Sequence, residues 1–139
     1  MDALQQEILG MGERARKAAL ALGNLTTAQK NAILESMADA LVVSEPTILE
    51  ANAKDLAAAE ANGLSSAMVD RLRLDGKRIA AIADGIRQVA ALPDPVGETL
   101  ADWTRPNGLH IVKKRVPIGV IGIIFESRPN VTSDAAVLC

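Results

Sequence analysis

Apolar side chains recur at helical spacing over the first two thirds of the chain. Between residues 2 and 22 they lie three or four positions apart, which places them on one face of a helix. This stripe consists of Leu4, Ile8, Met11, Ala15, Ala18 and Leu22. A second helix is predicted after Thr26, with its core face formed by Ile33, Met37, Ala40 and Leu41.

Proline and capping residues mark the ends of the next helices. Pro46 fits the first turn of a third helix, because a first-turn proline costs no hydrogen bond. Asn62-Gly63 predicts its end, since both residues tolerate a left-handed backbone. A short helix from Ser66 is followed by a longer one that begins near Asp75. Its core face is formed by Ile79, Ile82, Ile86 and Val89, and Pro93-Asp94-Pro95 ends the helical part.

The pattern then becomes extended. Residues 98–105 and 109–116 flank Pro106-Asn107-Gly108, and a turn tripeptide between two extended runs predicts a β-hairpin. Neither face of the second arm is cleanly apolar. An isolated hairpin is marginal in water, so we expect this one to need another strand or subunit.

A continuous apolar run, residues 118–125, follows the hairpin and predicts a strand buried on both faces, as in a parallel sheet. A polar turn at 126–130 leads into a helical pattern at 131–139. This order is the first half of a βαβ unit. Because no second parallel strand is present in these 139 residues, we expect the sheet to be completed by further chain.

Composition narrows the classes of function. The net charge is −2, and Lys and Arg are not clustered as binding to a nucleic-acid backbone requires. One cysteine and one histidine argue against a disulfide framework and a metal site. No apolar run reaches the roughly 18 residues of a membrane span. We therefore expect a cytoplasmic protein with no nucleic-acid or membrane partner.

The polar turn carries the candidate chemistry. In open α/β sheets, ligands bind beyond the carboxyl ends of strands, where the next helix begins. Asn130 can aim an amide at a developing oxyanion, or it can simply cap the helix. Arg128 suits phosphate or carboxylate, and Ser127 can donate to phosphate. Gly119 and Gly122 do not form the usual dinucleotide fingerprint.

The stretch "VPIGVIGIIFESRPNVTSDAA" resembles the γ-glutamyl phosphate reductase (glutamate-5-semialdehyde dehydrogenase) branch of the aldehyde dehydrogenase superfamily. The superfamily has a P-x-G-V-x-G-x-I strand and then a Pro-Trp-Asn turn. Here the strand matches, but Arg128-Pro129-Asn130 lacks the Trp and the turn carries two extra residues, which is typical of the reductase branch. The segments "LEANAKDLAAAEANGLSSAMVDRLRL" and "IADGIRQVAALPDPVG" resemble that branch too, so the likeness covers essentially the whole chain.

The resemblance implies an α/β, aldehyde-dehydrogenase-like fold, of which this chain is an N-terminal fragment. The fragment is then mostly α-helical, with a β-hairpin arm and the first strand and helix of the cofactor-binding domain. Residues 1–91 form a helical cluster of that domain, 92–117 the hairpin used for oligomerisation, and 118–139 the first, truncated βα unit.

The resemblance also implies an activity. The family enzyme reduces L-glutamate 5-phosphate with NADPH to L-glutamate 5-semialdehyde and phosphate, in proline biosynthesis, through a cysteine thioester. Its nucleophilic cysteine lies in a segment this chain lacks, so we expect the fragment to be inactive alone. Expected partners are the small-molecule substrate, further copies of the chain, and the glutamate 5-kinase that supplies the labile acyl phosphate.

Site residues follow residue by residue from the resemblance. Asn130 supplies an N–H to the oxyanion, and Phe125, Glu126 and Ser127 lie along the nicotinamide ribose. That Arg128 meets the substrate phosphate or carboxylate is our own hypothesis, based on charge alone.

Alternatives remain for the function and for two other residues. The chain could belong to an NAD-dependent dehydrogenase of free aldehydes, although such enzymes usually keep the Trp, or be a helical interaction module without chemistry. Cys139 lies in an apolar helical stretch, which favours a small core residue over a nucleophile. His110 lies in the hairpin arm, which favours a surface histidine over a general base.

Overall fold

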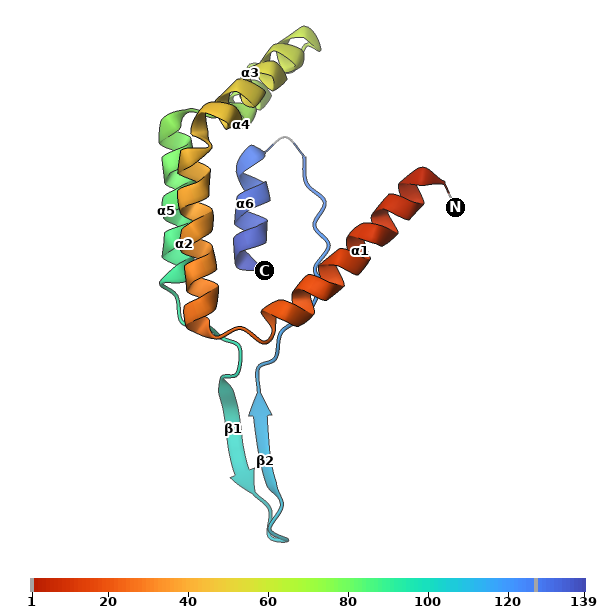
Figure 1. The fold of residues 1–139 in the computed structure, drawn as a ribbon, viewed down its shortest axis with the longest axis vertical. Coiled ribbons are helices and arrows are strands. Elements are labelled where there is room, and N and C mark those ends of the chain that lie inside the picture. Colours follow the sequence, from red (N-terminus) through yellow and green to blue (C-terminus); the bar gives the residue numbers. More distant parts are fainter. Residues whose placement is uncertain (1, 127) are drawn as a thin grey trace. The chain divides into compact units, whose positions relative to one another are not determined.

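The structure is a computed structural model that describes residues 2–126 and 128–139. The elements, in chain order, are α1 (Ala3–Leu22), α2 (Thr27–Val43), α3 (Glu45–Ala61), α4 (Ser66–Leu72), α5 (Gly76–Ala90), β1 (Thr99–Thr104), β2 (His110–Lys114) and α6 (Pro129–Leu138) (Figure 1). Contacts divide them into two compact units. One unit contains residues 2–27 and Pro93–Ile121, and the other contains Ala28–Leu92 and Gly122–Cys139. The domain boundaries expected from the sequence stay a prediction.

The first unit begins with α1, whose start is fixed by a capping box. The Asp2 carboxylate accepts from the Gln5 backbone at 2.7 Å, and the Gln5 side chain accepts from the Asp2 backbone at 3.3 Å. The predicted apolar stripe forms on this helix, but none of its described side chains is buried. Leu4 and Ile8, for example, are 66% and 57% exposed. Among the residues that the structure describes, the stripe is therefore largely open to solvent.

None of the helices in the described residues combines the length and the apolar character that a membrane span requires.

The predicted hairpin is present in the first unit. Strands β1 and β2 pair antiparallel, with Trp103 opposite Ile111 and Thr104 opposite His110. The turn places Gly108 at φ +84°, a conformation that favours glycine, and Arg105 donates its backbone N–H to Leu109 at 2.9 Å. Both faces of the ribbon are largely exposed. The expectation of a hairpin without a core of its own matches this geometry.

The apolar run 118–125 differs from its predicted state. It forms no strand here, and it is exposed rather than buried, with Ile118 at 87% and Ile124 fully accessible. The cause is physical: a strand exists through hydrogen bonds to a neighbouring strand, and no described segment pairs with this one. The run therefore has the apolar composition of a buried strand but lacks the hydrogen bonds to a neighbouring strand.

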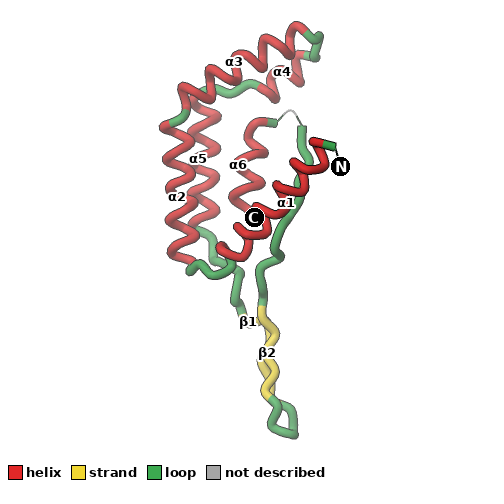
Figure 2. The backbone as a smooth tube through the Cα atoms, turned by 45° about the vertical axis from the view of Figure 1, so that its right-hand side comes forward, coloured by secondary structure: helices red, strands yellow, loops and turns green. Residues whose placement is uncertain are grey.

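The second unit is helical and holds the core. Helices α2 and α5 lie side by side, and α6 packs on α5 (Figures 1 and 2). Ala38 of α2 and Ala83 of α5 are completely buried and belong to one apolar cluster. Ile86 and Val137 complete the buried cluster. This packing fixes the start of α6 against the rest of the unit.

The core face of α5 is the predicted one, whereas that of α2 is rotated. In α5, Ile79 and Ile86 are buried as expected. In α2, Ala38 is the buried residue. The predicted core residues Met37 and Leu41 are half-buried against the core, while the predicted Ile33 and Ala40 are exposed. Apolar residues surround α2 on several sides, so its sequence alone does not single out one face.

Candidate functional site

The start of α6 displays the predicted polar residues. Arg128 occupies the N-cap position, with φ −133° and ψ 95°, and Pro129 begins the helix. Asn130 therefore lies in the first helical turn, so the alternative role of Asn130 as the helix cap is wrong. Its side-chain amide donates to the Asp134 carboxylate at 2.8 Å. Because an Asn amide has two N–H donors, this bond orients the group and leaves one donor for a ligand.

A hollow of about 390 Å³ opens beside Asn130, within the second unit. The end of α4, the connector after it, the first half of α5 and the start of α6 all contribute to its wall. The polar lining consists of Asp70, Arg71, Arg73, Arg78, Arg128 and Asn130, and the apolar lining of Leu74, Ala81, Ile82 and Pro129. Packing of α6 on α5 therefore brings together residues far apart in the sequence. We call this hollow the arginine pocket.

Charge in the arginine pocket is strongly positive, with four guanidinium groups and one carboxylate. Only Arg78 is neutralised: it pairs with Asp70 at 3.0 Å. The guanidinium groups of Arg71, Arg73 and Arg128 have no hydrogen-bond or ion-pair partner anywhere in residues 2–126 and 128–139. Like charges held close together repel each other unless an anion lies between them. The pocket is therefore suited to a carboxylate or a phosphate.

The connector that carries Arg73 is held from two sides. The buried Asn52 side chain donates to the Leu72 carbonyl and accepts from the Leu74 N–H, both at 2.8 Å. From the other side, Arg78 donates to the carbonyls of Asp70 and Arg73, both at 2.6 Å. These bonds define the connector geometry without any ligand.

Some of the predicted site residues line the arginine pocket and others do not. Asn130 and Arg128 both line the arginine pocket. Phe125 and Glu126 precede α6 and are exposed, and neither lines the pocket. Ser127 lies outside the described residues.

Sequence reasoning missed the other arginines of this pocket. Arg71, Arg73 and Arg78 lie in "DRLRLDGKR", a short basic stretch at the α4–α5 junction. The density of Arg in this stretch was a usable signal, because it places Arg71 in the last turn of α4, Arg73 at its C-cap and Arg78 in the first turn of α5.

Two further predictions concern Cys139 and His110. Cys139 follows the last turn of α6 and is exposed, so the expectation of a core cysteine is wrong for this structure. It lies at the opposite end of α6 from Asn130. His110 is an exposed histidine of the hairpin, as expected, and its Nε2 lies 2.6 Å from Asp102 Oδ1 on the facing strand.

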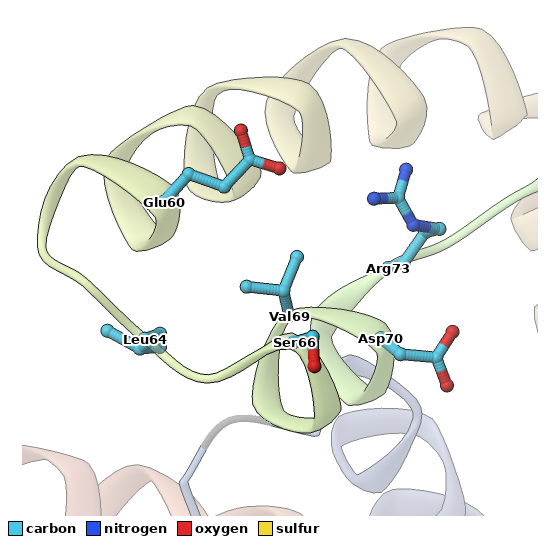
Figure 3. A pocket seen from close by; sticks show the side chains of 6 residues that line it. All are labelled: Glu60, Leu64, Ser66, Val69, Asp70 and Arg73. Atoms are coloured by element: carbon cyan, nitrogen blue, oxygen red, sulfur yellow. The ribbon is translucent and has the colours of Figure 1, made fainter.

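A second hollow, of about 500 Å³, lies between α3 and α4 (Figure 3). Glu60 of α3 and Val69 of α4 face it from opposite sides, and Ser66 and Asp70 of α4 also line it. Arg73 lines both this hollow and the arginine pocket. No predicted site residue lines the second hollow, and its charges are mixed, so it is the weaker candidate for an anion.

Comparison with curated proteins shows clear relatives. Gamma-glutamyl phosphate reductase of Brucella anthropi is 60% identical over 129 residues, which is 93% of this chain and 30% of the relative. The protein of the same name from Geobacter metallireducens is 54% identical over 136 residues, which is 98% of this chain and 32% of the relative. The chain thus spans about a third of the length of these relatives. No family model matches it.

Solved structures agree with the sequence relatives. Gamma-glutamyl phosphate reductase of Thermotoga maritima superimposes with a TM-score of 0.93 at 43% identity, covering 95% of this chain and 32% of the other. The protein of the same name from Saccharomyces cerevisiae gives a TM-score of 0.87 at 34% identity, covering 99% of this chain and 34% of the other. The resemblance found in the sequence and the fold it implies are confirmed.

Proposed function

We propose that this chain, a homologue of gamma-glutamyl phosphate reductases over nearly its whole length, is part of an enzyme that reduces L-glutamate 5-phosphate to L-glutamate 5-semialdehyde. In this reaction hydride and a proton enter, the acyl C–O bond to phosphate breaks, and inorganic phosphate leaves. The observation that carries the proposal is the identity of 54–60% to curated proteins of that name, over 93–98% of the chain. The positively charged pocket beside Asn130 supports it.

In this proposal Asn130 stabilises the oxyanion. Attack on an acyl phosphate converts the carbonyl oxygen into an alkoxide, and a fixed neutral N–H donor stabilises that charge. Asp134 holds the Asn130 amide from within the same helix at 2.8 Å, so the donor needs little rearrangement when charge develops. The attacking thiolate comes from a cysteine other than Cys139, which is exposed at the far end of α6.

Arg128 is proposed to meet an anionic group of the substrate. It lines the arginine pocket next to Asn130, and its guanidinium is unpaired in the described part of the chain. A planar guanidinium binds carboxylate or phosphoryl oxygens in a bidentate manner. The presence of Arg128 and Asn130 in the lining of one pocket supports this role.

The cofactor in this proposal is NADPH, which supplies a hydride when bound. Phe125, Glu126 and Ser127 are proposed to lie along its nicotinamide ribose, on the strength of the resemblance. Phe125 and Glu126 fit such a contact, because both are exposed and offer an apolar ring and a carboxylate acceptor close to the start of α6. The preference for NADPH over NADH rests on the resemblance alone.

The proposal extends to cellular context. The enzyme would act in proline biosynthesis in the cytoplasm, as a homo-oligomer, and receive its labile substrate from a glutamate 5-kinase. Oligomerisation through the hairpin is supported by its exposed apolar side chains, among them Trp103 at 42% exposure. An amphipathic ribbon of this kind gains stability by pairing with another surface.

The test is the reverse reaction of the complete enzyme. With L-glutamate 5-semialdehyde and NADP⁺, we expect NADPH to form only when inorganic phosphate is present. Turnover without phosphate would instead indicate a dehydrogenase of free aldehydes. A folded complete protein with no turnover would overturn the proposal and favour an interaction module.

A further inference from the structure

We propose that Arg71 and Arg73, together with Arg128, form a substrate-anion site in the arginine pocket, and that Asn52 is the positioning residue that holds it. The ligand is the carboxylate or the phosphoryl group of an acyl phosphate amino acid. This inference rests on the proposed function and adds residues from a second part of the chain to it.

The first step is the contrast between Arg78 and its neighbours. Arg78 is used internally, since it pairs with Asp70 at 3.0 Å and donates to two backbone carbonyls. Arg71 and Arg73 line the same pocket without any side-chain partner in the residues that the structure describes. The pocket therefore holds one structural arginine and a group of arginines available to a ligand.

The second step is the fixed backbone between them. Asn52 is 5% exposed, and both ends of its amide bond the connector, one at Leu72 and one at Leu74. A buried polar side chain with both functions satisfied by one short segment sets the shape of that segment. Because Arg71 and Arg73 flank Leu72, the amide sets the spacing of their backbones before a ligand binds.

The third step is the convergence of two distant segments. Helix α6 packs on α5, and Ile82 of α5 and Pro129 of α6 both line the pocket. Arg128 approaches from the start of α6, while Arg71 and Arg73 approach from the α4–α5 junction. The volume of about 390 Å³ lies within the range of about 300–1,000 Å³ typical of small-molecule sites.

The fourth step is the chemistry of the ligand. An acyl phosphate of an amino acid carries two separated anions, the α-carboxylate and the phosphoryl group. Guanidinium groups bind both anions through paired N–H donors, so the lining of the pocket fits either anion equally well. The reverse reaction separates them, because the phosphate and the carboxylate then arrive on two different molecules.

The experiment measures the complete enzyme in the reverse direction with Arg71→Gln, Arg73→Gln and Arg128→Gln. We expect at least Arg71→Gln and Arg128→Gln to raise one KM by about 10- to 100-fold, as loss of a charged hydrogen bond does. A raised KM for inorganic phosphate identifies the phosphoryl group as the ligand. A raised KM for the semialdehyde identifies the carboxylate.

The matched control is Lys77→Gln, which removes the same charge from an exposed position on α5 outside the pocket. We expect its two KM values to stay within about twofold of those of the unchanged enzyme, since Lys77 does not line the pocket and an exposed charge is screened by solvent and salt. If Arg71→Gln and Arg128→Gln fold and behave like Lys77→Gln, the anion site is overturned while the proposed function stands.

A binding measurement separates this inference from failure of the proposed function. If the complete protein shows no turnover, thermal unfolding with inorganic phosphate or glutarate as the probe still reports anion binding. We expect a rise in melting temperature that Arg71→Gln abolishes and Lys77→Gln keeps. No rise, or an equal rise in both variants, overturns the site.

The positioning role of Asn52 is tested by the KM values of a variant. Asn52→Ala releases the connector, so we expect the same KM to rise as in Arg71→Gln, by a smaller factor. A purely structural role would lower the amount of folded enzyme, and thus the apparent kcat, with both KM values unchanged. That second pattern would remove Asn52 from the site.

Discussion

The Asn130 amide donates a hydrogen bond to the Asp134 carboxylate at 2.8 Å, one turn further along α6. Both residues belong to the same helix, so their relation is set by local geometry and not by the placement of distant parts. The bond uses one N–H of the amide and fixes the plane of the group. The second N–H of the Asn130 amide is thereby held in a defined position in the first turn of α6.

Replacing Asn130 by Ala in the complete enzyme should lower kcat by about 10²- to 10³-fold, as expected for loss of one oxyanion donor. The KM values should change little, because the donor acts mainly on the transition state. Steady-state kinetics of the reverse reaction measure both effects.

Asp134→Ala provides the comparison. It leaves the Asn130 amide in place but removes its anchor, so kcat should fall less than in Asn130→Ala. An Asp134→Ala loss as large as that of Asn130→Ala would mean that Asp134 itself touches the reacting atoms. Equal activity of Asn130→Ala and the unchanged enzyme would exclude Asn130 as the donor.

Asn52→Ala should lower the free energy of unfolding by about 2–3 kcal/mol. The change leaves the partly buried Leu72 carbonyl and Leu74 N–H without the partners they have in the folded protein, and a group left unsatisfied inside a protein costs about 1–3 kcal/mol. Urea denaturation measures the loss. Gln88→Ala, at an exposed position of α5, serves as the control and should stay within about 0.5 kcal/mol. Equal effects of the two variants would contradict the role of Asn52.

Arg87 joins α5 to α2 through exposed ion pairs, and its effect should depend on salt. It lies 2.8 Å from Asp39 and 3.5 Å from Glu35, both on α2, and 3.3 Å from Asp84 in its own helix. Arg87→Gln should therefore lower the melting temperature at about 0.05 M salt and lower it less at about 1 M, where such pairs are screened. A difference that does not change with salt would show that Arg87 acts through packing.

The pH dependence of the same variant has a definite sign. The hydrogen bond with Asp39 raises the pKa of Arg87 above its ordinary value, with nearby Asp39, Glu35 and Asp84 charges acting in the same direction. A raised pKa adds stability that is fully present below the ordinary pKa and is lost only as pH rises through the higher one. Arginine stays protonated at all pH values in the physiological range, so the difference in melting temperature between Arg87→Gln and the unchanged protein should be flat from about pH 6 to 9. Melting curves across that range check it.

Gly63→Ala should destabilise the second unit by about 1–2 kcal/mol through its backbone alone, because a side chain is disfavoured in the left-handed region. Gly63 ends α3 at φ +72°, and an added Cβ would meet no atom within 4 Å. Gly85→Ala, inside α5 with equally open space, should instead stabilise by about 0.5–1 kcal/mol. Denaturant unfolding of the two variants compares them, and effects of the same sign would contradict the backbone explanation.

Local features of the fold could be predicted from the sequence because they depend on neighbouring residues. Asp75 caps α5 through the Arg78 N–H at 2.6 Å, and Pro46 lies in the first turn of α3, both as the pattern indicates. Gly108 takes the left-handed turn of the hairpin. Each of these outcomes is decided within a few residues.

Features that depend on distant partners could not be predicted. The run at 118–125 has the composition of a buried strand, but its state depends on whether a neighbouring strand is present. The α2 core face is set by α5, whose Ala83 packs in one cluster with Ala38. In the pocket, Arg128 was predicted from its position after the run, whereas Arg71 of α4 lines the same hollow because the fold brings the ends of α4 and α6 to one place.

The unpaired run at 118–125 has a consequence for handling of the protein. In the 139-residue chain Ile118, Ile123 and Ile124 lie open to water, at 87%, 47% and 103% exposure. An exposed apolar segment of this kind pairs readily with other chains. We therefore expect solutions of this chain to aggregate increasingly as the protein concentration rises.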